Sequence, residues 1–334
     1  MQHRSTLPAI LLACLGLCSL AATAAAIAAA GRLAHHPPQY LAACLLLRDA
    51  SRVDVREWVE YHLWAGVDKI FLFDHNSRLP VFADVVDYAL SGRVQYTYLP
   101  SEVPKAAGPK QFAEGLQGRV FNQCFLQGRG YFTWMMFTDL DEYMLVTDAS
   151  YNHSIPAVLR EYESTAGAVL VHRVNLGSGG LEKRAEGEGM LQAFTSCMLP
   201  PGEHLKGIAH LGYASISMNA HMFAYEGGRR GARVGDNATV GSAHRMPNAT
   251  SAPLVIYHYT GAVAEYTARV ATMPAGVSGM TSKSIDMYRQ LDAEATESCT
   301  AGREVYDLYT KEKRPSYGCD EKRRRQKRTR THDR

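Results

Sequence analysis

Apolar and polar positions alternate along the first half of the chain in blocks of strand and helix length. Short apolar runs predict buried strands, and the amphipathic segments between them predict helices. The strands are expected at 40–47, 69–73, 94–99 and 131–138, and the helices at 55–65, 81–90 and 112–127. Strand–helix–strand units favour parallel pairing with right-handed crossovers. The pattern therefore predicts an α/β fold, with a Rossmann-type mixed and mainly parallel sheet flanked by helices.

The pattern is looser after Pro156. The remaining elements are expected to be helices at 158–162 and 282–291, strands at 168–174 and 254–257, and a glycine turn at 177–180. No linker or repeat divides this stretch. We therefore expect one domain over 40–275, followed by a helical C-terminal extension over 276–310.

A single apolar segment precedes this domain. Leu7 to Ala30 carries no charge, and at about 1.5 Å per residue a helix of this length can cross a bilayer. We interpret 7–30 as an uncleaved transmembrane anchor, 1–6 as a cytosolic stub and 31–39 as a short stem, with the domain on the lumenal side. A cleaved signal peptide is the alternative, because the alanine-rich end offers cleavage sites.

The glycosylation sequons and the cysteines give information about the cellular compartment of the protein. Asn-x-Ser/Thr sequons begin at Asn152, Asn237 and Asn248, and together with the anchor they favour the secretory pathway. Outside the anchor the cysteines are odd in number, so the sequence does not give their pairing: Cys44, Cys124, Cys197, Cys299 and Cys319. No C-x-x-C pair occurs, and we expect no structural zinc.

The formal net charge of +3 conceals a basic C-terminus. Residues 319–334 contain eight Lys or Arg against three acids. We expect 311–334 to be a solvated, disordered tail. A nucleic-acid partner is not expected, because the anchor argues against a cytosolic or nuclear chain. Binding of the tail to anionic lipid or acidic polysaccharide stays open.

The most informative residues follow the strand at 131–138. Asp139 and Asp141 come directly after it, and in an extended backbone residues two apart point to the same face, while Leu140 turns to the core. Two carboxylates at the end of a buried strand suit a hard divalent metal that also binds phosphate oxygens. Glu142 adds like charge, which a positive group should offset. The alternative is a loop with ordinary surface acids.

Polar residues also end the two earlier strands. Arg48 and Asp49 follow one of them, and Asp74 ends the next. Ligands of open α/β sheets gather beyond the carboxyl ends of the strands. We therefore expect these residues to line one crevice together with Asp139 and Asp141.

Five motifs stand in the order in which a known family has them. They are Leu45-Leu46-Leu47-Arg48-Asp49, Glu57-Trp58-Val59-Glu60-Tyr61-His62, Gly66-Val67-Asp68, Phe73-Asp74-His75-Asn76-Ser77 and Phe137-Thr138-Asp139-Leu140-Asp141-Glu142-Tyr143. Gln117 and Phe121-Asn122-Gln123-Cys124 continue the match, and weaker likenesses follow at 176–180, 221–223 and 258–259. With these motifs the chain resembles glycosyltransferase family 92 over roughly residues 40–275.

The resemblance implies a GT-A fold and a metal-dependent, inverting transfer from a nucleotide sugar, commonly UDP-galactose, in a single-pass type II Golgi membrane protein. On this chain it implies that Asp139 and Asp141 bind Mn²⁺ or Mg²⁺ and the diphosphate. It also implies that Asp74 holds the nucleoside and that Arg48 and Asp49 flank the nucleotide pocket. The expected function is transfer of a hexose to a glycan or polysaccharide acceptor.

Inverting transfer needs a carboxylate that deprotonates the acceptor hydroxyl. Glu182, just after the glycine turn, is the first candidate for this base, and Asp236 is the second. His258 ends an apolar strand, and its neutral imidazole would complete the metal shell. A structural histidine is the alternative there.

Two other functions stay open. The family usually has Asn-Glu after the basic residue of the first strand and Lys-Ser soon after His-Tyr, whereas this chain has Asp49-Ala50 and Gly261-Ala262-Val263. These departures favour, as the alternative, a catalytically silent relative that binds a nucleotide or glycan. A phosphatase of the haloacid-dehalogenase type fits less well, because Tyr143 stands where that class needs Thr or Val.

Overall fold

A computed structural model describes most of the chain beyond Gln39. The described residues are 39–100, 115–217, 221, 223–240, 252–271 and 284–312. The chain divides into two units between Gln39 and Tyr40, and the fold below is that of the second. The expected stub and anchor, residues 31–38 of the expected stem, the sequon at Asn248 and the tail beyond Glu312 lie outside the described residues, whereas Gln39, the last residue of the expected stem, begins the first strand. Within the described part no helix is long and apolar enough to cross a membrane.

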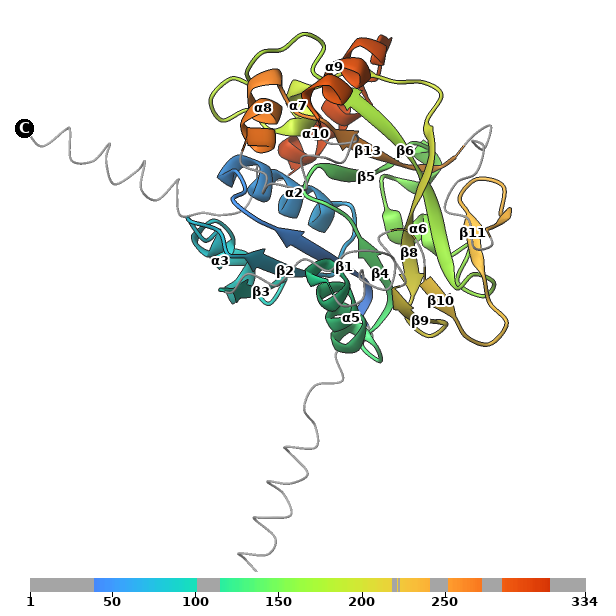
Figure 1. The fold of residues 1–334 in the computed structure, drawn as a ribbon. Helices are drawn as coiled ribbons and strands as arrows, with labels where there is room; N and C mark the ends of the chain where they lie inside the picture. The colour runs from blue at the N-terminus through green and yellow to red at the C-terminus, as the bar shows by residue number, and fades with distance from the viewer. Residues whose placement is uncertain are drawn as a thin grey trace, which may run out of the picture. The chain divides into compact units, whose positions relative to one another are not determined.

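The N-terminal half of the sheet consists of parallel strands (Figure 1). These are β1 (Gln39–Leu47), β2 (Lys69–His75) and β3 (Val94–Leu99), connected by α2 (Arg52–Trp64) and α3 (Phe82–Leu90). Leu47 pairs with Asp74, and Asp74 pairs with Tyr98. The carboxyl ends of the three strands are therefore level, as the strand–helix alternation predicts.

The C-terminal half pairs strands that are distant in the sequence. The sheet order is β12-β11-β6-β8-β4-β1-β2-β3, with β5 and β13 joined beside β6. β8 (Gly202–His210) runs antiparallel between β4 (Phe132–Phe137) and β6 (Ala168–Gly177). β13 (Leu254–Tyr259) is parallel to β6 and antiparallel to β5 (Glu142–Val146). The mixed α/β sheet is thus confirmed.

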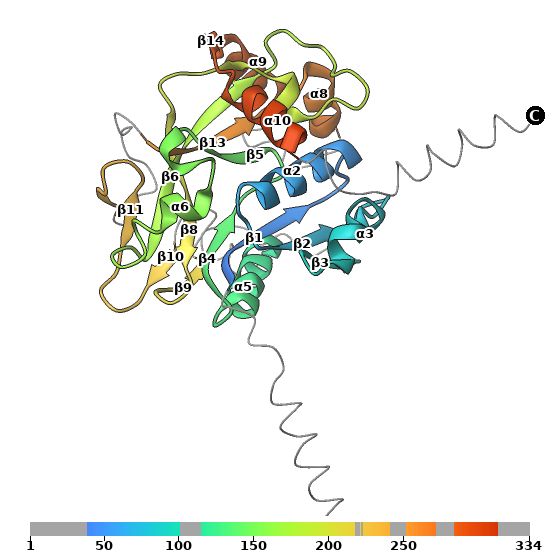
Figure 2. The ribbon, with the colours of Figure 1, turned by 180° about the vertical axis from the view of Figure 1, so that it is seen from behind.

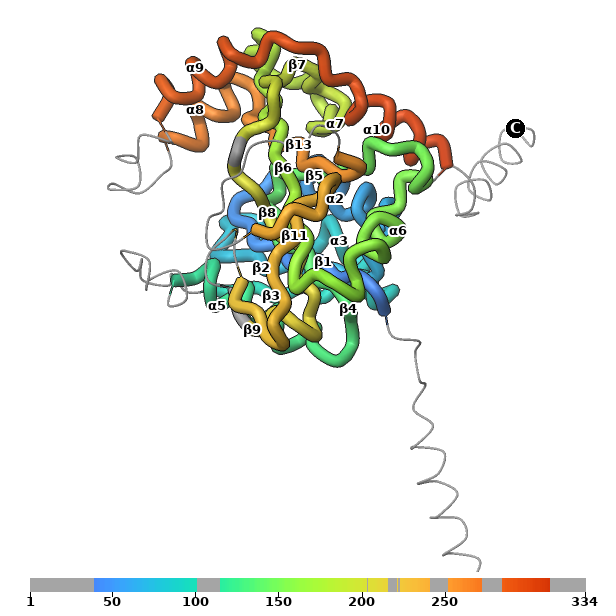
Figure 3. The backbone as a smooth tube through the Cα atoms, turned by 90° about the vertical axis from the view of Figure 1, so that its right-hand side faces the viewer, coloured from blue at the N-terminus to red at the C-terminus, as the bar shows by residue number. Residues whose placement is uncertain are grey.

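The remaining elements surround this sheet. They are α5 (Leu116–Gly128), η1 (Ala149–Tyr151), α6 (Ile155–Leu159), α7 (Met190–Ala193), β7 (Ser196–Cys197), β9 (Ala214–Ser217), β10 (Phe223–Tyr225), β11 (Gly231–Arg233), β12 (Thr239–Val240), α8 (Val263–Ala271), α9 (Ile285–Glu294), β14 (Glu297–Ser298) and α10 (Ala301–Glu312). Figure 3 shows the chain from α9 to α10 passing over β7 and α7. α10 extends two residues into the segment expected to be tail.

Side chains of β1 alternate between two apolar cores. Leu41 and Leu45 belong to the core that also contains Trp58 of α2, whereas Ala42 belongs to the core under Phe121 of α5. Figures 1 and 2 accordingly show α2 and α5 on opposite faces of β1. A strand buried on both faces reads as a continuous apolar run, which is why the sequence pattern found it.

Two disulfides cross-link the fold. Cys44 of β1 is bonded to Cys124 of α5, and Cys197 of β7 to Cys299, just before α10. The remaining candidate, Cys319, lies outside the described residues. Both bonds join segments far apart in the sequence, so they restrict the unfolded chain strongly.

The start of α2 differs from the sequence prediction. The helix was expected to begin at residue 55, but it begins at Arg52, and its cap is Ser51, whose hydroxyl accepts a hydrogen bond from the Asp54 backbone N–H. The Asp54 side chain is thereby left for another partner. The other end matches expectation, because Gly66 follows the helix with a φ of +103°, which favours glycine.

Candidate functional site

A cavity of about 600 Å³ opens beyond the carboxyl ends of the central strands. Its described lining includes Arg48 and Asp49 after β1, Asp139 and Asp141 after β4, and residues from the start of α2, from the 181–190 segment and from α8. Four of the residues expected at one crevice are thus brought together. Asp74 is not among the described lining residues.

The acidic pair lies in a tight turn between β4 and β5 rather than on an extended strand end. The Glu142 N–H donates to the Asp139 carbonyl at 3.1 Å, which closes the turn. The Tyr259 N–H donates to the Asp141 carbonyl at 2.8 Å and ties the turn to β13. The extended geometry expected from the sequence was therefore wrong, and the two carboxylates have different neighbours.

Asp139 is bound by a buried lysine. Lys206 Nζ of β8 lies 2.6 Å from Asp139 Oδ2 and 2.5 Å from Glu142 Oε2. Lys206 thus supplies the positive group that the Glu142 carboxylate was expected to need. Burial acts to raise the pKa of Asp139, but the Lys206 ammonium outweighs it and holds that pKa below its ordinary value. Burial raises the pKa of Glu142 to about 7, although Lys206 opposes the rise.

Asp141 faces His258 and a cation from α8. Asp141 Oδ2 lies 4.0 Å from His258 Nε2 and 3.1 Å from Arg269 Nη1. His258 Nδ1 lies 3.0 Å from Asn175 Oδ1 and so donates its proton there, which leaves the Nε2 lone pair toward Asp141. Burial lowers the pKa of His258 to about 4, so the imidazole is neutral at pH 7.

This pair fits a divalent metal. Two ligands held about 2.1 Å from one ion lie at most about 4.2 Å apart. The 4.0 Å between Asp141 Oδ2 and His258 Nε2 is within that limit. No cluster of three His, Cys, Asp or Glu that could hold a metal occurs in the described ranges. The described residues therefore offer two ligands to a metal at this point, Asp141 and His258.

A buried arginine joins three segments at the cavity wall. Arg184 binds Asp54 of α2 with both terminal nitrogens, at 2.6 and 3.0 Å, and its Nε lies 2.7 Å from Glu265 Oε1 of α8. Asp54 is only 4% exposed, so the pair is shielded from water. Sequence reasoning missed both Arg184 and Glu265. The available signal was the i, i+4 spacing of Glu265 and Arg269 on a short amphipathic segment.

The side of the cavity formed by Arg48, Asp49 and Arg78 contains a second ordered loop. Asp49 Oδ1 accepts a hydrogen bond from the Arg78 N–H at 2.9 Å, and the Asp49 N–H donates to Ser77 Oγ at 2.8 Å. Arg78 lines the cavity too, which the sequence did not indicate. Asp74 is fully buried beneath this loop, where its Oδ2 accepts from the Val81 N–H and the Tyr96 hydroxyl, both at 2.9 Å. It orders the loop and has no described contact with the cavity.

The two candidate bases lie in different places. Glu182 is exposed, and its carbonyl accepts from the Ala264 N–H, so it lies beside the cavity wall. Asp236 lies in the β11–β12 turn, where it is paired with Arg233. Arg233 is level with Leu170 of β6, whereas Asn175 of β6 is at the site. Five strand residues span about 16 Å, so the structure does not bring Asp236 to the cavity.

The glycine turn has a packing role. A Cβ at Gly177 would lie 2.7 Å from Ala295 Cβ and from Asp292 Oδ1. Asp292 of α9 in turn accepts hydrogen bonds from the backbone N–H and the hydroxyl of Ser178. The small residues at 177–178 therefore allow α9 to pack on the end of β6.

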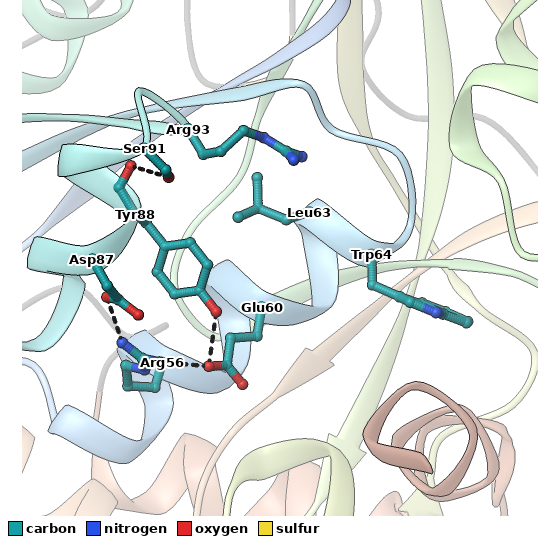
Figure 4. A pocket seen from close by; sticks show the side chains of 8 residues that line it. All are labelled: Arg56, Glu60, Leu63, Trp64, Asp87, Tyr88, Ser91 and Arg93. Carbon is teal, nitrogen blue, oxygen red and sulfur yellow. Dashed lines mark hydrogen bonds and ion pairs between the residues drawn. The ribbon is translucent and has the colours of Figure 1, made fainter. Parts of the chain in front are cut away.

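A larger groove of about 880 Å³ lies between α2 and α3 (Figure 4). It opens near Trp64 and Arg93, at the amino ends of β2 and β3, away from the acidic turn. Its charged groups bind one another: Arg56 lies 2.8 Å from both Glu60 and Asp87. The charged side chains of this groove are therefore already paired with one another, and the smaller cavity is the better candidate for a functional site.

An open α/β sheet with a charged cavity beyond its strand ends is typical of a nucleotide-binding protein. Residues 40–198 match the family model of Glycosyltransferase family 92. The resemblance of the sequence motifs to this family is thereby confirmed for that part of the chain.

Curated relatives carry the same family name. A glycosyltransferase family 92 protein of Ricinus communis is 26% identical over 227 residues, which are 66% of this chain and 35% of the relative. One of Oryza sativa subsp. japonica is 31% identical over 121 residues, which are 36% of this chain and 18% of the relative. The chain thus spans about a third or less of the length of these relatives.

Among solved structures, S. aureus TarS 1-349 is 13% identical, with a TM-score of 0.35 over 76% of this chain and 70% of that one. Glucosyl-3-phosphoglycerate synthase of Mycobacterium tuberculosis, in complex with Mn²⁺, UDP and phosphoglyceric acid, is 14% identical, with a TM-score of 0.25 over 41% of this chain and 43% of that one. Sequence identities and TM-scores this low support no conclusion about the cavity.

Proposed function

We propose that this chain is a metal-dependent glycosyltransferase that transfers a hexose, galactose being the first candidate, from a UDP-sugar to a glycan with inversion. The family 92 match supports the reaction class. The observation that carries the proposal is the Asp141–His258 pair, in which Asp141 lines the cavity and faces His258.

The chemistry needs positive charge beside the leaving diphosphate. A bound Mn²⁺ or Mg²⁺ supplies it, and Asp141 and His258 are the residues that would hold the ion. Arg48, Arg78 and Arg269 line the same cavity and would bind diphosphate oxygens. The amino end of α2 also opens to this cavity, where its backbone dipole favours an anion.

The acceptor hydroxyl must lose a proton during transfer. We keep Glu182 as the candidate base, because its exposed carboxylate is two residues from Arg184 in the cavity wall. Glu265 also lines the cavity, but Arg184 and the Ala262 N–H bind its two oxygens. Because both oxygens of Glu265 already accept hydrogen bonds, this carboxylate is less available to the acceptor hydroxyl, which favours Glu182.

We further propose that the protein works in the Golgi lumen, attached by the segment 7–30. The two disulfides support an oxidising compartment. Asn152 and Asn237 are exposed, so both sequons are accessible to glycosylation. Digestion of the secretory-pathway protein with an N-glycosidase should increase its mobility on a gel, and unchanged mobility would contradict this location.

The test of the reaction uses the full chain purified in detergent. With UDP-galactose and Mn²⁺ it should release UDP, and a chelator should abolish the release. Asp141→Asn should lower the rate at least a hundredfold, whereas Asp87→Asn, a change in the separate α2–α3 groove, should not. Metal-independent release that survives Asp141→Asn would overturn the proposal.

The second candidate is a catalytically silent binding protein. Arg269 favours it, because its guanidinium already binds the Asp141 oxygen that faces His258. Calorimetric titration of UDP with and without Mn²⁺ distinguishes the two functions. Absence of metal-dependent UDP binding would favour the silent protein.

A further inference from the structure

We propose that Lys206 is a positioning residue for the donor cavity, which sets the orientation of the Asp139 carboxylate and the charge beside Asp141. The inference rests on the proposed function, because it concerns the same cavity. No sequence motif marks Lys206, which stands among apolar and small residues between His204 and His210. The structure places it directly behind the acidic turn.

Two neighbouring strands fix the position of Lys206. It pairs with Val171 of β6, and Ile208, two residues further along β8, pairs with Met136 of β4. Because β4 and β8 are antiparallel, Lys206 is level with residue 138, at the point where the turn begins. Its side chain is 4% exposed, and an ammonium so buried is stable only beside anions.

Lys206, Asp139 and Glu142 form a closed ring of hydrogen bonds. Glu142 Oε2 accepts from the Asp139 backbone N–H at 2.9 Å and from Lys206 Nζ, and Nζ also donates to Asp139 Oδ2. The Glu142 side chain is 1% exposed, whereas that of Asp139 is 45% exposed. The ring therefore extends from the core to the cavity, and a buried cation holds a carboxylate that lines it.

The ring also sets the charge that a diphosphate meets. Asp139, Asp141 and Glu142 bring three carboxylates to one turn, and Lys206 offsets one of them. At an effective dielectric constant of about 20, one unit charge roughly 8 Å away changes the affinity for an anion by more than about tenfold. Loss of Lys206 alone should thus weaken UDP binding, although Lys206 lies behind the surface of the cavity. Loss of Lys206 together with Glu142 leaves the net charge of the turn unchanged, and it acts only through the orientation of Asp139.

A purely structural role would be limited to neutralising Glu142. The variant Lys206→Met alone would leave Glu142 buried without its cation and could unfold the protein. The test therefore pairs the substitutions as K206M/E142Q, which removes both buried charges and keeps similar side-chain volumes. The matched control is R56M/D87N, which removes an ion pair in the α2–α3 groove.

Thermal melting should show that both double variants fold. Calorimetry with UDP and Mn²⁺ should then give at least a tenfold higher Kd for K206M/E142Q, because Asp139 loses the ammonium that orients its carboxylate, and an unchanged Kd for R56M/D87N. In an Asp139→Asn background, K206M/E142Q should have a much smaller effect, because Lys206 acts through Asp139.

Two results would overturn the inference. If folded K206M/E142Q binds UDP and Mn²⁺ within twofold of the wild type, Lys206 has only a structural role. If the effects of K206M/E142Q and Asp139→Asn on the Kd for UDP are fully additive, Lys206 does not act through Asp139. A wild-type protein that binds no UDP at all overturns the proposed function as well, so the two failures are distinguishable.

Discussion

The N-terminal half of the sheet (β1, β2 and β3) and its C-terminal half (β6, β8 and β13) contribute to the cavity in different ways. The first half is made of consecutive strand–helix units, and its strand ends are level because the pairing is parallel. The second half is made of antiparallel and distant pairings, and it brings in Lys206 and His258. The first half thus provides the frame of the cavity, and the second provides the partners of both carboxylates.

The two carboxylates of the acidic turn show what this difference means. Asp139 is bound by a buried ammonium, whereas Asp141 faces a neutral imidazole and a guanidinium. Two residues of sequence therefore separate a carboxylate bound by a buried ammonium from the one that we propose as a metal ligand. The partners, not the spacing, distinguish their roles.

The Arg184–Asp54 ion pair joins the two halves, and its removal should have the largest effect on stability. Arg184→Met leaves Asp54 buried without its partner, and we expect a loss of about 3 kcal/mol in the free energy of unfolding. The double variant R184M/D54N should recover most of that loss. Urea denaturation measures both, and an unchanged stability of Arg184→Met would show that the halves do not depend on this pair.

Glu57 provides a second junction, and its effect depends on pH. Its Oε1 accepts hydrogen bonds from the Tyr143 hydroxyl and the Leu191 N–H, and burial raises its pKa to about 7. The folded state thus binds more protons than the unfolded state between about pH 4.5 and 7, so stability is lost as the pH rises through this window. Because a tenfold change in proton affinity corresponds to about 1.4 kcal/mol, the expected loss of stability is about 3 kcal/mol.

Glu57→Gln should make that pH dependence less steep, and the remainder should come from Glu142, whose pKa burial also raises to about 7. Melting temperatures measured from pH 5 to pH 8 would show it, with Glu60→Gln, a change on the groove side of α2, as the control. A wild-type profile that is equally steep in Glu57→Gln would contradict the assignment of the pH dependence to this carboxyl.

The sequence revealed the first half of the sheet more completely than the second. Strands buried on both faces, such as β1, stand out as apolar runs, and Asp139 and Asp141 stand out because they follow one. Lys206, Arg184 and Arg269 could not be found, because their partners lie 67, 130 and 128 residues away. Strand β8 was missed because its buried Lys206 makes it look polar.

The smallest expected effect on stability comes from a substitution in the N-terminal half alone. Ser51→Ala removes the cap of α2 and should cost about 1 kcal/mol of stability. Ser284→Ala, which removes the equivalent cap of α9, is the matched control for helix capping. Because Ser51 also lines the cavity, only Ser51→Ala should in addition weaken UDP binding. Equal UDP affinities in the two variants would contradict a role for the amino end of α2.

The most direct test of the proposed metal site is the affinity for Mn²⁺ in the presence of UDP, measured by electron paramagnetic resonance. Asp141→Asn and His258→Gln should each raise the Kd for Mn²⁺ at least tenfold. Asp87→Asn should leave it unchanged. An unchanged Kd in both Asp141→Asn and His258→Gln would contradict the claim that these two side chains hold the metal.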